Sequence, residues 1–288
     1  VNIHHNITSA IVINGYSGIH IIGRLGGEIH QTTADTMGLY IYGSTDGVLI
    51  DGIRLIGGTT ASGTQAPGIL IGKLDTDATT KQNIKIKNCY ISNFTWAGIG
   101  LYGNQFTGGD PLIQNVEISG NYINSCGNGV FLYKNCQDVS IHDNYIYNAW
   151  ADGIICDTRS GTDAAVSKAC YRIKVDGNII YSPGVATPCI GVLFKGDVVD
   201  SSITNNIIKD VGERSVDNTL RTYGIALIDC YTEVLNVTNC VVLGNVIDGV
   251  VNNSGGLPAT DKWSIGIWLG DNAKNVSISG NTIQNVGF

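Results

Sequence analysis

Residues 120–157 read GNYINSCGNGVFLYKNCQDVSIHDNYIYNAWADGIICD and contain one short pattern twice. Asn121-Tyr122-Ile123 returns as Asn144-Tyr145-Ile146, and Gly129-Val130-Phe131-Leu132 returns as Gly153-Ile154-Ile155-Cys156. The repeat length of 23–24 residues lies in the range typical of solenoid proteins. So short a unit can bury its apolar side chains only against neighbouring copies of itself.

Two kinds of segment carry this pattern along the chain. The first reads apolar-x-apolar-x-x-Asn-x-Ile, with clear copies at 116–123, 139–146, 173–180, 202–208, 241–247 and 276–283 and weaker copies at 84–91, 48–55 and 19–25. The second reads Gly-apolar-x-apolar and occurs at 38–41, 68–71, 98–101, 129–132, 153–156, 191–194, 224–227 and 266–269. Both alternate with a period of two, which predicts strands. The nine copies predict an all-β chain: a single parallel β-solenoid domain over residues 1–288, with about nine coils and loop insertions.

The asparagines of the first segment occupy one turn in successive coils. Stacked side chains there can hydrogen-bond to one another and to the backbone groups that a tight turn leaves unpaired. The pattern predicts a structural ladder rather than a reactive site. Its members are Asn121, Asn144, Asn178, Asn206, Asn245 and Asn281.

This pattern resembles the right-handed parallel β-helix of the pectin-lyase-like superfamily, over almost the whole chain. The opening residues 1–23 resemble the first coils of such proteins, which a capping helix normally precedes. The resemblance implies that the sequence is a fragment of a longer chain, lacking its N-terminal cap and a C-terminal continuation. Within the superfamily, the closest functional resemblance is to phage tailspikes and polysaccharide depolymerases. That resemblance implies a homotrimer located in a virion tail or at a cell surface.

Composition excludes several classes of function. The net charge is −7 and no block of Lys and Arg occurs, which argues against a nucleic-acid partner. No apolar run approaches the length of a membrane span. The eight cysteines show no CxxC pair; we expect buried free thiols, such as Cys89, Cys156 and Cys240, while a Cys170–Cys189 disulfide stays open.

In the Gly-apolar-x-apolar strands, the third residue and the residue just beyond the fourth should face outward. Aromatic side chains recur there and could stack on sugar rings; the alternative is that a loop or a neighbouring subunit covers the strip. The predicted substrate-binding residues are Tyr102, Phe131, Tyr133, Lys134, Arg159, Lys195 and Trp268.

Carboxylates gather on the same predicted face. Asp157, Asp197 and Asp229 fall on neighbouring coils, and Asp157 and Asp229 should lie about 9.6 Å apart by the stacking distance. Carboxylates about 6.5–9.5 Å apart suit inverting glycoside hydrolysis. These three aspartates are the predicted catalytic residues. No spacing typical of a metal site links the histidines, so no cofactor is expected, although the aspartates leave calcium open.

The sequence therefore predicts a protein that binds and cleaves a bacterial surface polysaccharide by glycoside hydrolysis with paired carboxylates. One alternative is a secreted polysaccharide lyase or C5-epimerase, using Lys195 or Arg159 with Tyr133. The other is a non-catalytic adhesin or structural fibre whose aromatic column lies in a subunit interface.

Overall fold

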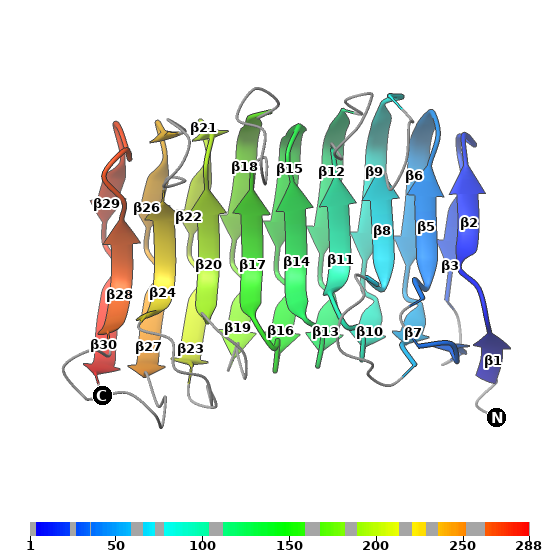
Figure 1. Ribbon diagram of the computed structural model, residues 1–288, viewed down its shortest axis with the longest axis horizontal. Coiled ribbons are helices and arrows are strands. Elements are labelled where there is room, and N and C mark those ends of the chain that lie inside the picture. The colour runs from blue at the N-terminus through cyan, green and yellow to red at the C-terminus, as the bar shows by residue number, and fades with distance from the viewer. Residues whose placement is uncertain are drawn as a thin grey trace.

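The computed structural model describes residues 4–23, 27–34, 36–58, 66–72, 78–103, 112–158, 168–181, 189–212, 221–228, 236–251 and 263–287. Over these residues the chain winds into a right-handed parallel β-helix built from three parallel sheets (Figure 1). The predicted fold class is thereby confirmed. The described strands form nine coils, and the two chain ends lie at opposite ends of the stack.

Sheet A consists of β1 (His4–Ile7), β4 (Glu28–Gln31), β7 (Arg54–Ile56), β10 (Tyr90–Ser92), β13 (Tyr122–Asn124), β16 (Tyr145–Tyr147), β19 (Ile179–Tyr181), β23 (Ile207–Val211), β27 (Val246–Val251) and β30 (Thr282–Gly287). Sheet B consists of β2 (Ile11–Asn14), β5 (Leu39–Tyr42), β8 (Ile69–Gly72), β11 (Ala97–Tyr102), β14 (Asn128–Tyr133), β17 (Asp152–Asp157), β20 (Ile190–Lys195), β24 (Arg221–Ile228) and β28 (Trp263–Leu269). Sheet C consists of β3 (His20–Ile22), β6 (Thr45–Asp51), β9 (Lys81–Lys87), β12 (Ile113–Ser119), β15 (Cys136–His142), β18 (Cys170–Asp176), β22 (Ser202–Thr204), β26 (Val241–Leu243) and β29 (Ser277–Ser279), with the short strands β21 (Val198–Val199) and β25 (Val237–Thr238) at its side.

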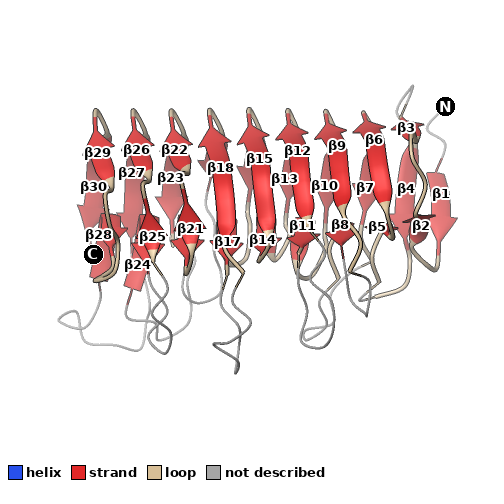
Figure 2. Cartoon of the chain, turned by 90° about the horizontal axis from the view of Figure 1, so that it is seen from above, coloured by secondary structure: helices blue, strands red, loops and turns tan. Residues whose placement is uncertain are grey.

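Each coil runs from sheet B to sheet C to sheet A, so the two sequence segments correspond to three strands. The Gly-apolar-x-apolar segment forms the sheet B strand. The Asn-containing segment forms two strands, one in sheet C and one in sheet A, joined by a short turn; residues 116–123, for example, cover the end of β12 and the start of β13. Figure 2 shows these turns aligned along one edge of the solenoid.

The core is a continuous column of inward-facing aliphatic side chains. In the sheet B strands from β5 to β24 the second and fourth residues of the motif enter this core, as Val192 and Phe194 do in β20, both fully buried. The motif glycine is required by close packing. A Cβ placed on Gly191 would lie 2.5 Å from the carbonyl oxygen of Gly224 on the next coil and 2.5 Å from Cγ2 of Ile208 on sheet A.

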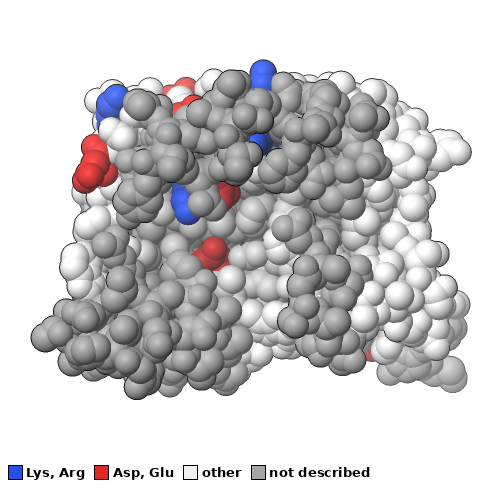
Figure 3. Space-filling view, viewed as in Figure 1, with Lys and Arg blue, Asp and Glu red and all other residues white. Residues whose placement is uncertain are grey.

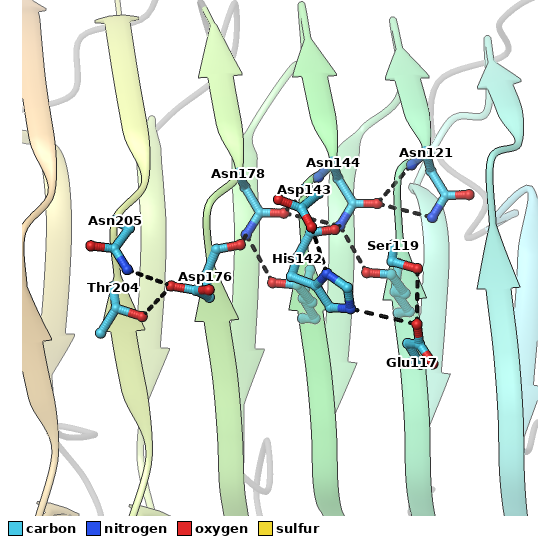
Figure 4. Close-up of polar contacts among 12 residues, drawn as sticks. Glu117, Ser119, Asn121, His142, Asp143, Asn144, Asp176, Asn178, Thr204 and Asn205 are labelled. Atoms are coloured by element: carbon cyan, nitrogen blue, oxygen red, sulfur yellow. Dashed lines mark hydrogen bonds and ion pairs between the residues drawn. The ribbon is translucent and has the colours of Figure 1, made fainter.

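The asparagine ladder runs along the C-to-A turn (Figure 4). The Nδ2 of Asn144 donates to Oδ1 of Asn178 at 2.9 Å and to the Ile118 carbonyl at 2.9 Å, while Oδ1 of Asn178 also accepts from the Asn144 backbone amide at 3.1 Å. The same donor-to-acceptor chain links all six predicted members, through side-chain contacts at Asn121, Asn144, Asn178, Asn206, Asn245 and Asn281. Because five of them are at most 1% exposed, the ladder satisfies amides that water cannot reach.

The ladder begins where the sequence pattern weakens. Cys89 takes the turn position in the preceding coil, and its backbone amide donates to Oδ1 of Asn121 at 3.0 Å.

The seven cysteines of the described residues are all buried free thiols. Cys170 and Cys189 are among them, so the possible disulfide between these two residues is not formed. Burial raises the pKa of Cys126 to about 12, which keeps this thiol protonated at neutral pH.

No helix long and apolar enough to cross a membrane occurs in the described part of the chain.

Candidate functional site

One outer column of sheet B brings phenol, carboxylate and ammonium side chains together. Strand register places Tyr102, Tyr133, Asp157 and Lys195 opposite one another on β11, β14, β17 and β20. Adjacent strands lie about 4.8 Å apart. The Asp157 carboxylate therefore has a phenol on the coil before it and an ammonium on the coil after it.

The members of this column differ in exposure. Asp157 is 3% exposed and Tyr102 is 3% exposed, whereas Tyr133 and Lys195 are only partly buried. A ligand reaching this face would contact Tyr133 and Lys195 first, with the carboxylate deeper between them. Burial raises the pKa of Tyr102 far above its ordinary value, with smaller contributions from Tyr133 and the charge of Asp157, so Tyr102 stays a neutral hydroxyl.

Lys134 adds a second positive charge next to this column. Its backbone is left-handed, with φ 51°, and its amide donates to the Asp157 carbonyl at 3.2 Å. The Nζ atom lies 5.0 Å from the centroid of the Tyr133 ring, which is within the range of a cation–π contact. Lys134 is 4% exposed, so its charge acts on the column from beneath the surface.

Asp197 is held by contacts at the corner that follows β20. Its backbone amide donates to Oγ1 of Thr158 at 2.6 Å, and its Oδ1 accepts from the backbone amide of Asn236 at 2.8 Å. Thr158 is in turn bonded to the same coil, because its amide donates to the Lys195 carbonyl at 2.9 Å. Strand register pairs Asp157 with Lys195. Asp197 lies two residues further along the chain, and its two hydrogen bonds fix its orientation.

The neighbouring outer column is largely apolar and partly covered. Phe131, Ile155, Leu193, Ala226 and Trp268 succeed one another in register. Ile155 is 6% exposed, Leu193 4% and Ala226 0%, and they pack with Tyr223 and Ile190 in a second apolar cluster outside the main core. One alternative predicted from the sequence was a continuous, exposed aromatic strip on this face. The middle of the column is neither aromatic nor exposed. Branched aliphatic side chains there are buried within the single chain.

Aromatic contacts remain at both ends of this column. The Phe131 ring lies 5.0 Å from Trp96 and 6.0 Å from Tyr133, and the Trp268 ring lies 6.2 Å from Tyr223, as centroid distances. Figure 3 shows this face of the molecule, on which the coloured acidic and basic side chains are few. Arg159 and Asp229, also predicted for the site, lie outside the described residues. Among the residues the structure describes, no group of three or more His, Cys, Asp or Glu side chains could hold a metal ion.

Two outer faces carry side chains that the sequence reasoning did not select. On sheet C, the Nε2 of His142 lies 3.6 Å from Oε1 of Glu117 and its Nδ1 lies 2.9 Å from Oδ2 of Asp143 (Figure 4). Hydrogen bonding from Lys85 lowers the pKa of Glu117, which remains a carboxylate within this network. The Glu117–His142 contact joins neighbouring coils, and the Ser119 hydroxyl also donates to Oε1 of Glu117 at 3.2 Å.

On sheet A, tyrosine side chains stack from coil to coil. Tyr90 and Tyr122 have ring centroids 5.3 Å apart, and Tyr122 and Tyr145 have centroids 5.2 Å apart. A sequence signal for them exists: each tyrosine directly follows the turn position held by Cys89, Asn121 or Asn144. Strand periodicity alone does not single out these positions.

No protein-family model and no curated protein matches this sequence. Solved structures do match in three dimensions. An alginate lyase from Paenibacillus sp. str. FPU-7 aligns with a TM-score of 0.51 and 17% identity, covering 96% of this chain and 100% of that one. A tailspike protein variant of E. coli bacteriophage HK620 aligns with a TM-score of 0.51 and 13% identity, covering 97% of this chain and 48% of that one. At these identities the similarity shows the fold alone, a parallel β-helix.

Proposed function

We propose that this protein binds a bacterial surface polysaccharide along the outer face of sheet B and cleaves it by glycoside hydrolysis. The observation that carries the proposal is the column of Tyr133, Asp157 and Lys195, in which a nearly buried carboxylate lies between a phenol and an ammonium on adjacent coils. Solved structures of similar fold include an alginate lyase and a phage tailspike, which supports an acidic or cell-surface glycan as the substrate class.

Each side chain has a distinct task in this proposal. Phe131, Tyr133 and Trp268 offer apolar ring surface to sugar rings, and Lys195 and Lys134 attract acidic groups of the glycan. Asp157 acts as one catalytic carboxylate. In a poorly solvated position its interaction with developing charge is stronger than it would be in water.

The second carboxylate is Asp197 or Asp229. Asp197 has the advantage of a fixed orientation, because Oδ1 accepts from the Asn236 amide at 2.8 Å. Hydrolysis with inversion requires the two carboxyl groups to leave room for a water molecule between them and the sugar. Separate Asp197→Asn and Asp229→Asn variants identify the second carboxylate. The variant at the catalytic position should lose activity as Asp157→Asn does, and the other should keep it.

A polysaccharide lyase or C5-epimerase is the second candidate, and the same column favours it in a different way. Both reactions start with removal of the proton next to the uronate carboxylate by a base. Lys195 could neutralise that carboxylate and Tyr133 could exchange the proton, with no need for a second aspartate. The products distinguish the three reactions: elimination leaves an unsaturated uronate together with a new reducing end, hydrolysis leaves a new reducing end without unsaturation, and epimerisation cleaves no glycosidic bond.

The deciding experiment is an activity screen on capsular polysaccharides, O-antigen polysaccharides and alginate. Reducing ends and ultraviolet absorbance are followed together for the wild-type chain, Asp157→Asn, Lys195→Gln and Tyr133→Phe. Asp138→Asn serves as a matched control, because Asp138 lies on sheet C and pairs with Arg172. Reducing ends that form without ultraviolet absorbance, disappear in the Asp157 variant and persist in the Asp138 control establish the hydrolase.

The other outcomes are equally specific. Ultraviolet-absorbing products that depend on Tyr133 and Lys195 assign the lyase reaction. Binding without cleavage identifies an adhesin, and neither binding nor cleavage across the panel refutes the proposed site. We further propose a homotrimer located in a virion tail or at a cell surface; a sedimentation experiment that finds a monomer at micromolar concentration contradicts this assembly.

A further inference from the structure

The tyrosines on the outer face of sheet A form a continuous strip on a different side of the solenoid from Asp157. We define the tyrosine strip as Tyr90, Tyr122, Tyr145, Tyr147 and Tyr181. Strand register aligns the first three in one outer column and the last two in the next. The path is unbroken, since the Tyr145 and Tyr147 centroids lie 6.4 Å apart and those of Tyr147 and Tyr181 lie 5.5 Å apart.

The rings of the first column are nearly parallel and follow one another from coil to coil. Tyr90 and Tyr122 are nearly parallel, at 5°, with centroids 5.3 Å apart, and Tyr122 and Tyr145 are at 10° with centroids 5.2 Å apart. Parallel rings prefer an offset arrangement, in which part of a ring face stays accessible from outside. Tyr122, the middle ring of the first column, is 37% exposed.

The strip itself carries no charge between its ends. At one end the Arg54 guanidinium lies 4.3 Å from the Tyr90 centroid and is paired with Glu28 at 2.6 Å. At the other end Lys209 follows Tyr181 in register and is followed in turn by Asp248, so each cation has an acid on the neighbouring strand.

Polar side chains flank the rings. Ser92 and Asn124 run beside Tyr90 and Tyr122 in the second outer column, which continues as Tyr147. The phenol hydroxyls and the partly buried Asn124 offer hydrogen bonds along an apolar surface, whereas Ser92 is 3% exposed. The sheet B site differs, because Lys134 and Lys195 make it cationic.

The shape of the strip restricts what can bind it. It is one to two side chains wide and crosses four strands, so its length is about 14 Å at the strand spacing. A specific protein interface buries about 800 Å² on each partner, which so narrow a strip does not supply. A linear polymer lying along the solenoid axis does match it, and a pyranose ring presents a flat C–H face above and hydroxyls at its rim.

We propose that the tyrosine strip is a second glycan-binding site, which takes an extended, uncharged segment of about three pyranose units. One sugar ring rests on each of Tyr90, Tyr122 and Tyr145, while Asn124 and the Tyr147 hydroxyl bind sugar hydroxyls. This site is separate from the sheet B column and does not require cleavage. A polysaccharide that contacted both sheets would be held more tightly than by either one, because the second contact is intramolecular.

The test uses the full chain carrying Asp157→Asn and Lys195→Gln, so that the sheet B column neither cleaves nor attracts the probe. Cellohexaose and xylohexaose are the extended neutral probes, a mannuronate hexamer is the acidic one, and calorimetry measures affinity. Tyr122→Ala is compared with Tyr171→Ala, which removes a ring of similar exposure (40%) from sheet C. Tyr122→Phe keeps the stacking surface, and thermal melting of each variant verifies the fold.

We expect at least one neutral hexasaccharide to bind, and Tyr122→Ala to weaken it about three- to tenfold, as expected for the loss of one aromatic contact. Tyr171→Ala and Tyr122→Phe should stay within about twofold of the parent. The mannuronate hexamer should bind the parent more weakly than the neutral probes do.

Three results overturn the proposal: no binding of either neutral probe at millimolar concentration, equal affinity in folded Tyr122→Ala, or a change in sedimentation of Tyr122→Ala with sugar affinity unchanged. The last result would make the strip a contact between chains. All three are independent of whether the wild-type chain cleaves any polysaccharide.

Discussion

The asparagine ladder permits a quantitative prediction at its centre. Asn178 is fully buried and makes five hydrogen bonds. Asn178→Ala deletes all five and leaves the Asn144 amide without its acceptor at 3.1 Å. An orphaned buried amide costs about 1–3 kcal/mol. The two hydrogens on the Asn178 Nδ2 contribute about 1 kcal/mol net each, whereas the Asn144 Nδ2 keeps two other carbonyl acceptors. The expected loss is about 3–5 kcal/mol in the free energy of unfolding.

The matched control is the same substitution at the end of the ladder. Asn281 is only partly buried, and water can replace its contacts with Asn245. Asn281→Ala should therefore cost about 1 kcal/mol. Urea unfolding followed by circular dichroism measures both free energies. Equal destabilisation by the two substitutions, within about 0.5 kcal/mol, would refute the idea that burial of the central amides gives the ladder its strength.

Three further predictions concern packing, charge and thiols. Gly191→Ala should lower the melting temperature by several degrees, because a Cβ on Gly191 meets the Gly224 carbonyl at 2.5 Å. Gly18→Ala should lower it by less, because a Cβ there meets no atom within 4 Å, and the remaining cost comes from its positive φ of 68°. Hydrogen bonds from Arg172 lower the pKa of Asp138. The stability that this pair adds is therefore present above the unfolded-state pKa and is lost as the pH falls through the lowered folded-state pKa. Arg172→Gln should raise the Asp138 pKa in an NMR titration, and an unchanged pKa would contradict the assignment. Burial raises the pKa of Cys89 and of Cys240 to about 11. A maleimide at pH 8 should therefore label neither thiol until urea unfolds the chain, which peptide mass spectrometry can verify. Labelling of the native protein would show that these thiols become exposed to solvent without unfolding.

The solenoid could be predicted because its chemistry repeats. From Gly38 to Gly224, Gly191 and its counterparts face a carbonyl of the next coil, so each of these coils needs a residue without a side chain at that point. Asn178 and its counterparts hydrogen-bond to the coil before and to the coil after at one buried turn. This requires a side chain that has both a donor and an acceptor. Where the local requirement recurs, the sequence recurs, and the fold can be read from it.

The candidate site could be predicted only in part, because its features do not repeat. The alternation rule placed Asp157 and Lys195 on one outer face, and strand register made them neighbours. The rule carries no information on burial of outward positions, so it did not distinguish Leu193, which is 4% exposed, from a solvent-facing residue. The hydrogen bond from Asn236 to Asp197 joins residues 39 positions apart, and no periodicity predicts it.

The asparagine ladder also gives the solenoid a direction. Every linked amide donates from its Nδ2 to the oxygen of the following coil, so the side-chain dipoles from Asn121 to Asn281 add head to tail along the axis. Such a chain of hydrogen bonds polarises itself, and each link strengthens the next. The two faces of any coil are therefore chemically different: one presents an acceptor and the other a donor. A coil transplanted in reverse order would place like poles together, so modules exchanged between such solenoids must keep their orientation.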